Sequence, residues 1–237
     1  MVFSDRGSRP DWVLFEDDHC LVANKPAGLA TQGRAGEDSL EARVKRLLDP
    51  DDPTRVFLGI PQRLDRPVSG VLLFAKTPKA ARRLAEQFAS RAIRKEYWAV
   101  VEGRPEPAEG TWDDCLLEKR GNDPPATQVV AEGTPKARKA ITRYRRDAGD
   151  RLSADLSQVR LWPETGRRHQ LRAQLSARGS PIVGDALYGA HRSFGGGIAL
   201  HARSLRFMHP SSRATLTILA DPPTVWVEAG FDFARSA

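Results

Sequence analysis

The chain has 237 residues and a formal net charge of +7 at neutral pH, a length that can bury the core of one large domain or two small ones. Its longest strongly apolar run, GVLLFA, is far shorter than the ~20 residues that cross a bilayer, and its polar start has no secretory apolar region. Two cysteines, Cys20 and Cys115, cannot by themselves build a disulfide framework or a four-ligand zinc site, so we expect a cytoplasmic protein without a membrane anchor.

The first part of the chain predicts a disordered segment followed by a hairpin. Residues 1–11 are polar, and we expect them to be poorly ordered. Residues 12–237 contain no linker or internal repeat, and we expect them to form one domain. Within that domain, two apolar runs around the polar EDDH predict a β-hairpin over residues 12–25.

A helix and two buried strands are predicted next. Residues 38–48 place apolar side chains on one helical face, with Asp38 as the N-cap and Glu41 completing a capping box. The apolar segments RVFLGI (55–60) and GVLLFAK (70–76) predict buried strands on either side of the polar segment QRLDRPVSG.

A second helix and a long strand follow. Thr77 is the predicted N-cap of this helix and Pro78 its first residue. The segment KEYWAVVEG (95–103) predicts the strand. The apolar face of the helix is expected to consist of Ala81, Leu84, Ala85 and Phe88.

The second half of the chain predicts a sheet with one more helix. Residues 104–161 contain strand-like pieces, and the polar stretch 119–128 predicts a mobile loop among them. Residues 166–179 predict a helix that ends at a glycine. Closing strands are expected over 197–210 and 213–221. Strands that interleave irregularly with three helices predict an α+β fold with a mixed, largely antiparallel sheet.

Asp65 is the first candidate for chemistry, because it lies between Arg63 and Arg66 at a predicted turn. A carboxylate in such a loop usually pairs with its arginine neighbours. The alternative is an ionised catalytic group that meets a polyanion, and the positive net charge favours an anionic partner such as nucleic acid. Ser69 is a weak nucleophile candidate, since its flanks do not form G-x-S-x-G.

Other candidates have structural alternatives. Tyr97 is predicted on a strand, where most aromatic rings pack in the core, although such a ring can also stack on a base. The sequence has no G-x-x-x-x-G-K-[ST], no H-E-x-x-H and no paired C-x-x-C, so it predicts neither a phosphate loop nor a metal site. Four side chains near the start of the last predicted helix suit phosphate binding, or else form a solvated face with a structural histidine: Arg167, Arg168, His169 and Arg172.

Six ordered segments together resemble the RluA-type pseudouridine synthases, over about residues 15–219. RLDRPVSGVLLFAKT is similar to the family's catalytic motif H-R-L-D-x-x-T-S-G. KEYWAVVEG is similar to K-x-Y-x-A-x-V-x-G, and GRRHQLRAQL is similar to G-R-x-H-Q-[IL]-R. The remaining matches are NKPAGL, GSPIVGDALYG and LHARSLRFMHP.

The resemblance implies an RNA pseudouridine synthase, an isomerase that converts specific uridines of ribosomal or transfer RNA to pseudouridine. It implies that Asp65 is the catalytic aspartate, that Arg172 pairs with it, and that Tyr97 stacks on the flipped uracil and helps to remove the C5 proton. No cofactor is expected, because the isomerisation involves no redox change and no group transfer. The residues expected to contact RNA in a central cleft are Arg63, Arg66, Lys76, Lys95, Arg167, Arg168 and His169.

Two departures and two rival functions remain open at this point. Gln62 and Val68 stand where the family commonly has His and Thr. Because the segment before the first motif is short, we expect no S4-type RNA-binding domain such as many relatives carry, and we expect RNA binding to rest on the catalytic domain. The rivals are an inactive RNA-binding module on the same scaffold and a hydrolytic nucleosidase, which usually needs a second carboxylate.

We expect a monomer with no obligate protein partner. The sequence selects neither the target uridine nor between a nucleophilic and a glycal route.

Overall fold

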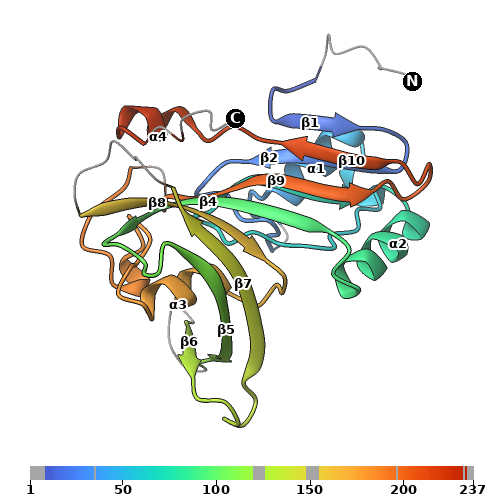
Figure 1. Ribbon diagram of the computed structural model, residues 1–237. Helices are drawn as coiled ribbons and strands as arrows, with labels where there is room; N and C mark the ends of the chain where they lie inside the picture. Colours follow the sequence, from blue (N-terminus) through green and yellow to red (C-terminus); the bar gives the residue numbers. More distant parts are fainter. Residues whose placement is uncertain are drawn as a thin grey trace.

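A computed structural model describes residues 9–34, 36–119, 126–147, 155–195, 197–231 and 233. Its strands are β1 (Val13–Glu16), β2 (Cys20–Lys25), β3 (Ser69–Ala75), β4 (Arg94–Glu102), β5 (Glu109–Glu118), β6 (Thr127–Val130), β7 (Arg138–Arg146), β8 (Leu156–Pro163), β9 (Leu200–Met208) and β10 (Thr215–Leu219). These ten strands form one sheet in the order β1-β2-β3-β9-β4-β8-β7-β5-β6, with β10 against β9 (Figure 1). The β3–β9 pair is parallel and the other pairs are antiparallel, so the predicted mixed, largely antiparallel sheet is confirmed.

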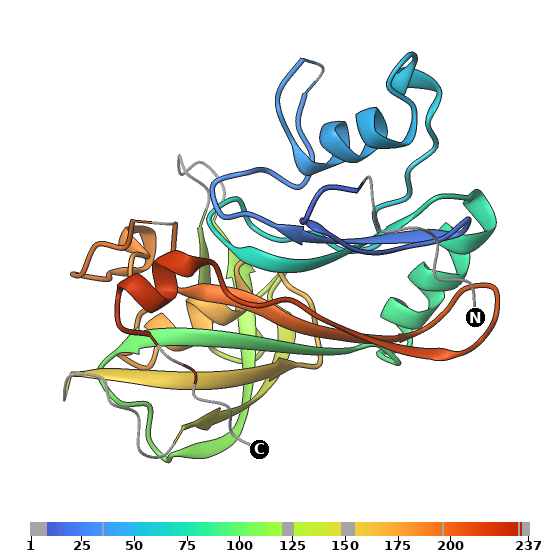
Figure 2. The same ribbon diagram turned by 90° about the horizontal axis from the view of Figure 1, so that it is seen from above.

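Helices cover the sheet and complete an α+β fold, as predicted. They are α1 (Leu40–Leu48), α2 (Pro78–Ala89), α3 (Gln170–Ser176) and α4 (Thr224–Glu228), with short 3-10 turns η2 (Pro53–Arg55) and η3 (Ala186–Tyr188). Figure 2 shows α1 and α2 on opposite sides of β2 and β3, and Figure 1 places α3 inside the curve of β5, β7 and β8. In the part of the chain that the structure describes, no helix is long and apolar enough to cross a membrane.

Strand β3 is buried at every position because both of its faces are covered. Side chains alternate between the two faces of a strand, so neighbouring residues enter different cores. Leu72 and Phe74 belong to the same core as Val44 of α1. Val71 packs in a second core with Leu84 of α2. Each such side chain contributes roughly 1.5–3 kcal/mol when fully buried, and this double burial fixes the strand that follows Asp65.

The helix caps agree in part with the sequence. Thr77 caps α2 as predicted, since its side chain accepts a hydrogen bond from the backbone of residue 80. The cap predicted for α1 is wrong by one residue, because Ser39 Oγ accepts from Ala42 N at 3.2 Å. Asp38 instead pairs with Arg43 and Arg46 on the surface. In α2 the buried alanine is residue 80, whereas residue 85, predicted on the apolar face, is exposed.

Other predictions need correction or cannot be compared. Residues 55–60 do not form a strand; they make one isolated bridge, between Gly59 and Ala75. The helix predicted over 166–179 is confined to α3 because His169 has a left-handed backbone (φ 50°). Helix α4 was not predicted, being a single short turn after two prolines. Parts of the predicted N-terminal segment and of the 119–128 loop, residues 1–8 and 120–125, lie outside the described residues.

The two halves of the sheet meet where β3 runs beside β9, and Gly70 permits this contact. Gly70 has φ +117°, and a Cβ added there would lie 2.3 Å from Ala202 O. A side chain would therefore meet both backbone strain and a steric clash with β9.

Replacing Gly70 with alanine is expected to lower the free energy of unfolding by more than about 3 kcal/mol, because strain and clash act together. Gly133→Ala is the matched control, since Gly133 also has positive φ (+82°) but nothing lies within 4 Å of its added Cβ. Strain alone should cost the control about 1–2 kcal/mol. Urea denaturation of both variants measures the difference, and equal losses would show that close packing of β3 on β9 is unimportant.

Candidate active site

The loop before β3 carries Asp65, and its backbone is fixed on both sides of that residue. Thr31 Oγ1 donates a hydrogen bond to Leu64 O (2.8 Å) and accepts one from Leu64 N (3.1 Å). Gly28 N donates to Arg66 O (2.8 Å), and Arg66 Nε donates back to Gly28 O (2.9 Å). The segment that follows β2 therefore positions Asp65 through the residues that flank it.

Lys25 is fully buried under the same loop. Its ammonium group donates to Pro26 O (2.9 Å), Leu29 O (2.7 Å) and Arg66 O (3.2 Å). Burial lowers the pKa of Lys25 to about 8, while the negative charge of Asp65 acts in the opposite direction. Lys25 thus fixes the loop and adds a positive charge near Asp65.

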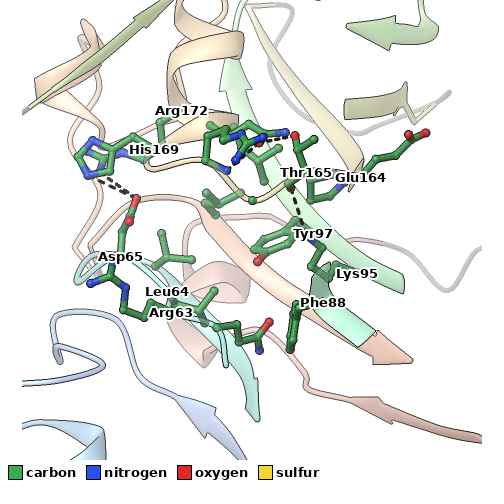
Figure 3. Close-up of a pocket in the computed structure, with 18 of the residues that line it drawn as sticks. Arg63, Leu64, Asp65, Phe88, Lys95, Tyr97, Glu164, Thr165, His169 and Arg172 are labelled. Atoms are coloured by element: carbon green, nitrogen blue, oxygen red, sulfur yellow. Dashed lines mark hydrogen bonds and ion pairs between the residues drawn. The ribbon is translucent and has the colours of Figure 1, made fainter. Parts of the chain in front are cut away.

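Asp65 and Arg172 meet although 107 positions separate them. Arg172 Nη1 lies 3.2 Å from Asp65 Oδ2, so the contact that the sequence predicted is present (Figure 3). The local alternative is wrong: neither Arg63 nor Arg66, both within the described residues, forms an ion pair with Asp65. Arg172 is also not on a solvated helix face, because its side chain is only 6% exposed.

Asp185 is a site residue to which sequence reasoning gave no role, as are Tyr188 and Lys25. It is 1% exposed and binds the Arg172 guanidinium through two short contacts, from Nε (2.7 Å) and Nη2 (2.8 Å). The ring of Tyr188 lies under the same guanidinium, 4.8 Å from its central carbon. Both residues lie in the segment GSPIVGDALYG, which signalled the family but gave no indication of these contacts.

His169 also faces Asp65. Its Nε2 lies 3.7 Å from Asp65 Oδ2, and its Nδ1 is hydrogen-bonded to the hydroxyl of Tyr188 at 2.9 Å. Burial lowers the pKa of His169, and the charge of Asp65 opposes this effect. The histidine predicted to contact RNA is therefore held beside the candidate catalytic carboxylate.

Strand β4 supplies Tyr97 and Lys95 to the opposite wall of the site (Figure 3). Burial, reinforced by the charge of Asp65, raises the pKa of Tyr97, so its hydroxyl stays protonated at neutral pH. Lys95 Nζ donates to Thr165 O at 3.1 Å, and burial lowers the pKa of Lys95 to about 8. Trp98 points the other way along the strand and stacks on Phe233.

One cleft, with a volume of about 490 Å³, is lined by Asp65, Lys95, Tyr97, His169 and Arg172. Of the seven residues expected to contact RNA, four line it: Arg63, Lys95, Arg167 and His169. Arg66 and Arg168 are exposed outside the cleft lining. Lys76 does not belong to this site, because its ammonium pairs with Glu16 at 2.7 Å and lines a separate hollow beside α1.

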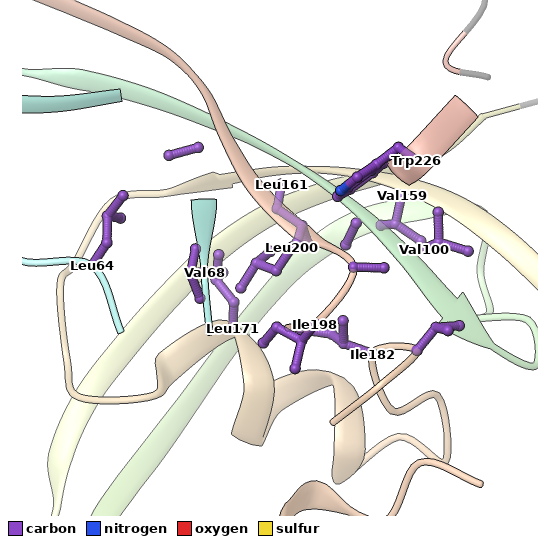
Figure 4. Packing of buried hydrophobic residues seen from close by; sticks show 14 of the residues in the cluster. Leu64, Val68, Val100, Val159, Leu161, Leu171, Ile182, Ile198, Leu200 and Trp226 are labelled. Carbon is purple, nitrogen blue, oxygen red and sulfur yellow. The ribbon is translucent and has the colours of Figure 1, made fainter. Parts of the chain in front are cut away.

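An apolar layer supports the cleft from below. Leu64, Val68, Leu171 and Leu200 line the cleft and also belong to the main core (Figure 4). Val68 is 2% exposed, so its departure from the family's threonine changes a packed position. The other departure, Gln62, also lines the cleft, and its amide donates weakly to a β3 carbonyl at 3.4 Å.

One cluster of candidate metal ligands lies away from the cleft, among the described residues at Asp17, Cys20 and His209. Backbone N–H groups of Ser211 and Ser212 donate to His209 Nδ1 (3.3 and 3.0 Å), so that atom carries no proton. The proton therefore sits on Nε2, which lies 2.7 Å from Asp17 Oδ2 and has no lone pair for a metal. Burial also raises the pKa of Cys20, so that in the absence of a metal ion it stays a thiol. These residues do not fit a metal ion.

Ser69 is likewise unsuited to nucleophilic chemistry. It is 1% exposed and shares a hydrogen bond with His201 Nδ1 (2.8 Å), while His201 Nε2 donates to Ala220 O (3.0 Å). Burial lowers the pKa of His201 to about 4, so the ring is neutral. The pair ties β3 to β9 inside the core and has no access to a substrate.

Comparison with known proteins identifies the family to which this site belongs. Residues 19–177 match the family model described as RNA pseudouridylate synthase. An uncharacterised RNA pseudouridine synthase of Zymomonas mobilis is 37% identical over 222 residues, which cover 92% of this chain and 97% of that protein. The dual-specificity RNA pseudouridine synthase RluA of Escherichia coli is 37% identical over 213 residues, or 88% of this chain and 91% of RluA.

Solved structures show the same fold. Human RNA pseudouridylate synthase domain containing 4 superposes with a TM-score of 0.71 at 24% identity, covering 92% of this chain and 90% of that one. Human RNA pseudouridylate synthase domain containing 1 gives a TM-score of 0.73, also at 24% identity, covering 93% of this chain and 85% of the other. The chain therefore belongs to the RNA pseudouridylate synthase family, and its sequence places it with the RluA type.

Proposed function

We propose that this protein isomerises specific uridines of ribosomal or transfer RNA to pseudouridine, and that Asp65 is its catalytic group. The observation that carries the assignment is the buried Arg172 guanidinium directed at the Asp65 carboxylate inside a basic cleft. The relatives named above are RNA pseudouridine synthases, and another, a ribosomal large subunit pseudouridine synthase D of Xanthomonas campestris, is 35% identical over 244 residues, covering 95% of this chain and 71% of that protein.

The reaction breaks the N1–C1′ bond, turns the uracil and joins C5 to C1′. Asp65 acts either as the nucleophile at C1′ or as the base that removes the 2′ proton. Either route uses an ionised carboxylate, for which a cation at 3.2 Å is a favourable partner. Arg172 and His169 both approach Oδ2, so we assign Oδ1 to the substrate.

Tyr97 is proposed to stack on the flipped uracil. Stacking on an aromatic ring is worth about 1–3 kcal/mol per base, which offsets part of the unstacking cost of a few kcal/mol. The raised pKa of Tyr97 makes its hydroxyl a poor base at neutral pH, so stacking is the better supported part of its expected role.

The cleft arginines and lysine are proposed to hold the RNA backbone. Arg63, Lys95 and Arg167 line the cleft and are spaced around Asp65 and Tyr97. Their positive charges counter the repulsion between an anionic carboxylate and the phosphates. Arg66 and Arg168, exposed outside the lining, are proposed to contact flanking nucleotides.

The rival functions fit the geometry less well. A hydrolytic nucleosidase usually needs a second carboxylate as acid or base. The other carboxylate of the cleft lining, Glu164, points away from Asp65 (Figure 3), and Asp185 is buried with both oxygens occupied by Arg172. An inactive RNA-binding module has no need of a buried ion pair at the cleft.

We also propose that the protein acts as a monomer in the cytoplasm, where the free thiols of Cys20 and Cys115 are stable.

Asp65→Asn is expected to abolish turnover by at least about 10⁴-fold while folding and RNA affinity stay unchanged, because Asn keeps the shape and loses the charge. Since the isomerisation does not change mass, activity is measured by carbodiimide labelling and primer extension on total RNA from cells that lack the gene. Asp113→Asn, which breaks only the surface pair with Lys139, is the control. Pseudouridine formation by Asp65→Asn above contamination would refute the assignment.

Arg63→Ala is expected to weaken RNA binding about 10-fold and to reduce the salt dependence of binding by a slope of about 0.7. Lys76→Ala is the matched control and should change affinity by no more than about twofold, because Lys76 lies outside the cleft. Filter binding over a range of salt concentrations measures both. An equal loss in the two variants would place the RNA on another surface.

Activity is expected to survive exhaustive treatment with EDTA, because the reaction uses Asp65 and the one His/Cys/Asp cluster among the described residues lies outside the cleft lining. The primer-extension assay is run on RNA folded beforehand, so that loss of magnesium does not act through the substrate. Restoration of a lost activity by added zinc would contradict this expectation.

A further inference from the structure

We propose that Asp185 and Tyr188 are positioning residues for the reaction: Asp185 holds Arg172 so that it binds one oxygen of Asp65, and Tyr188 holds His169 with its Nε2–H toward that oxygen. The proposal rests on the proposed function and deepens it. It turns the segment 182–188 into a second support for Asp65, on the opposite side from the loop that carries it.

The Arg172 guanidinium makes its shorter and more numerous contacts with Asp185 rather than with Asp65. Its Nε and Nη2 form the parallel, bidentate pair with the two oxygens of Asp185, at 2.7 and 2.8 Å. The contact to Asp65 uses the remaining nitrogen, Nη1, and is longer at 3.2 Å. Bidentate arginine–carboxylate pairs are the stronger and more directional arrangement, so Asp185 sets where the guanidinium lies.

This order of contacts matters for the reacting carboxylate. A guanidinium without Asp185 would turn its two-nitrogen edge to Asp65 and occupy both oxygens of that carboxylate. The substrate would then compete with Arg172 for Oδ1. Asp185 also balances the buried positive charge, because one guanidinium faces two carboxylates and is neutralised by the buried one.

The backbone around Asp185 is itself tightly fixed. Gly184 has φ +87°, and an added Cβ would lie 2.7 Å from the Phe194 side chain and 2.8 Å from Gly197 O. Asp185 N donates to Ile182 O at 2.9 Å. Ile198, the residue after Gly197, donates a backbone hydrogen bond to Pro67 O in the loop that carries Asp65. Residues 197–198 therefore contact both the residue before Asp185 and the loop that carries Asp65, and so help to fix the two carboxylates relative to each other.

Tyr188 determines which nitrogen of His169 carries the proton. The Tyr188 hydroxyl accepts a hydrogen bond from Thr127 N (2.9 Å), so its own proton is free to go to His169 Nδ1 (2.9 Å). An accepting Nδ1 leaves the proton of the neutral ring on Nε2, the atom 3.7 Å from Asp65 Oδ2. The charged and titratable groups that face His169 are Asp65, Arg172, Arg168, Asp185 and Tyr188.

Asp185→Asn tests the first contact. We expect kcat to fall about 10- to 100-fold, as for outer partners that orient metal ligands, with RNA affinity within about twofold of wild type. Asp114→Asn is the matched control, because Asp114 likewise binds an arginine, Arg178, together with Gln174 of α3, but lies outside the cleft. Wild-type kcat in Asp185→Asn would overturn the proposal, as would the same loss in the control.

A crystal structure of Asp185→Asn separates this proposal from the assignment of function, because it needs no activity. The expected result is an Arg172 guanidinium that has turned to contact both oxygens of Asp65. An unmoved guanidinium would show that Asp185 does not position it, even if the protein proves to be a pseudouridine synthase. Absence of pseudouridine formation by the wild-type protein would instead defeat the function while leaving the expected movement intact.

Tyr188→Phe tests the second contact and keeps the ring under Arg172, so it tests the proposal even if Asp185→Asn fails to fold. Losing one hydrogen bond should lower kcat roughly 2- to 10-fold. Without the Tyr188 proton on Nδ1, the neutral His169 ring can carry its own proton on Nδ1 and lose the Nε2–H that faces Asp65, whereas the protonated ring keeps it. The loss of kcat should therefore be larger at about pH 8 than at about pH 6, so the ratio of kcat at about pH 6 to kcat at about pH 8 should rise relative to the wild type. Tyr144→Phe, which removes a hydroxyl bound to Pro107 O away from the cleft, should leave both values unchanged.

A double mutant distinguishes positioning from general support of the fold. In a His169→Gln background the ring that Tyr188 controls is gone, so adding Tyr188→Phe should have no further effect on kcat or on its pH dependence. An effect that persists in this background would mean that Tyr188 acts through Thr127 or the core, and the proposal would be wrong.

Discussion

One guanidinium, that of Arg172, lies between two carboxylates and is almost completely shielded from water, and the geometry of the site depends on it. Removing an ion from water costs several kcal/mol, which only close and well-directed contacts offset. Arg172 has three such contacts, two to Asp185 and one to Asp65. To make them, helix α3, the 182–188 segment and the loop before β3 must all reach the same point. The fold can be understood as the arrangement that brings them there.

The sheet meets this requirement through the β3–β9 contact, where its two halves join. Gly70 lets the strand after Asp65 run directly against β9, and the β9 side of that contact leads back to residues 197–198 beside Asp185. On the other side, Lys25 and Thr31 hold the residues that flank Asp65. A carboxylate fixed from both sides needs little reorganisation when a substrate arrives, which is the advantage of a preorganised electrostatic site.

The sequence predicted the residues and elements that local patterns and family motifs determine. It missed the contacts that form between residues far apart in the chain. Asp65, Tyr97 and Arg172 were predicted as site residues because their motifs are distinctive; all three line one cleft, and the contact between the first and the last is present. Asp185 gave no signal of its contacts, since nothing local shows which arginine will reach it. Lys76 was placed in the cleft on charge alone, but charge does not indicate which face of the molecule a side chain occupies. The segment 55–60 looked like a strand because apolar residues also occur in a loop, and here the segment pairs with β3 only through the single bridge between Gly59 and Ala75.

The most direct test of the account is a crystal structure of the Asp65→Asn variant bound to a uridine-containing RNA that the wild-type protein modifies. The account predicts that the target uridine is flipped into the cleft with its uracil on Tyr97. Its C1′ should then lie about 3–3.5 Å from the residue 65 side-chain atom that does not face Arg172. A uridine bound outside the cleft, or a ribose that approaches from the Arg172 side, would contradict the assignment of Asp65 Oδ1 as the reacting atom.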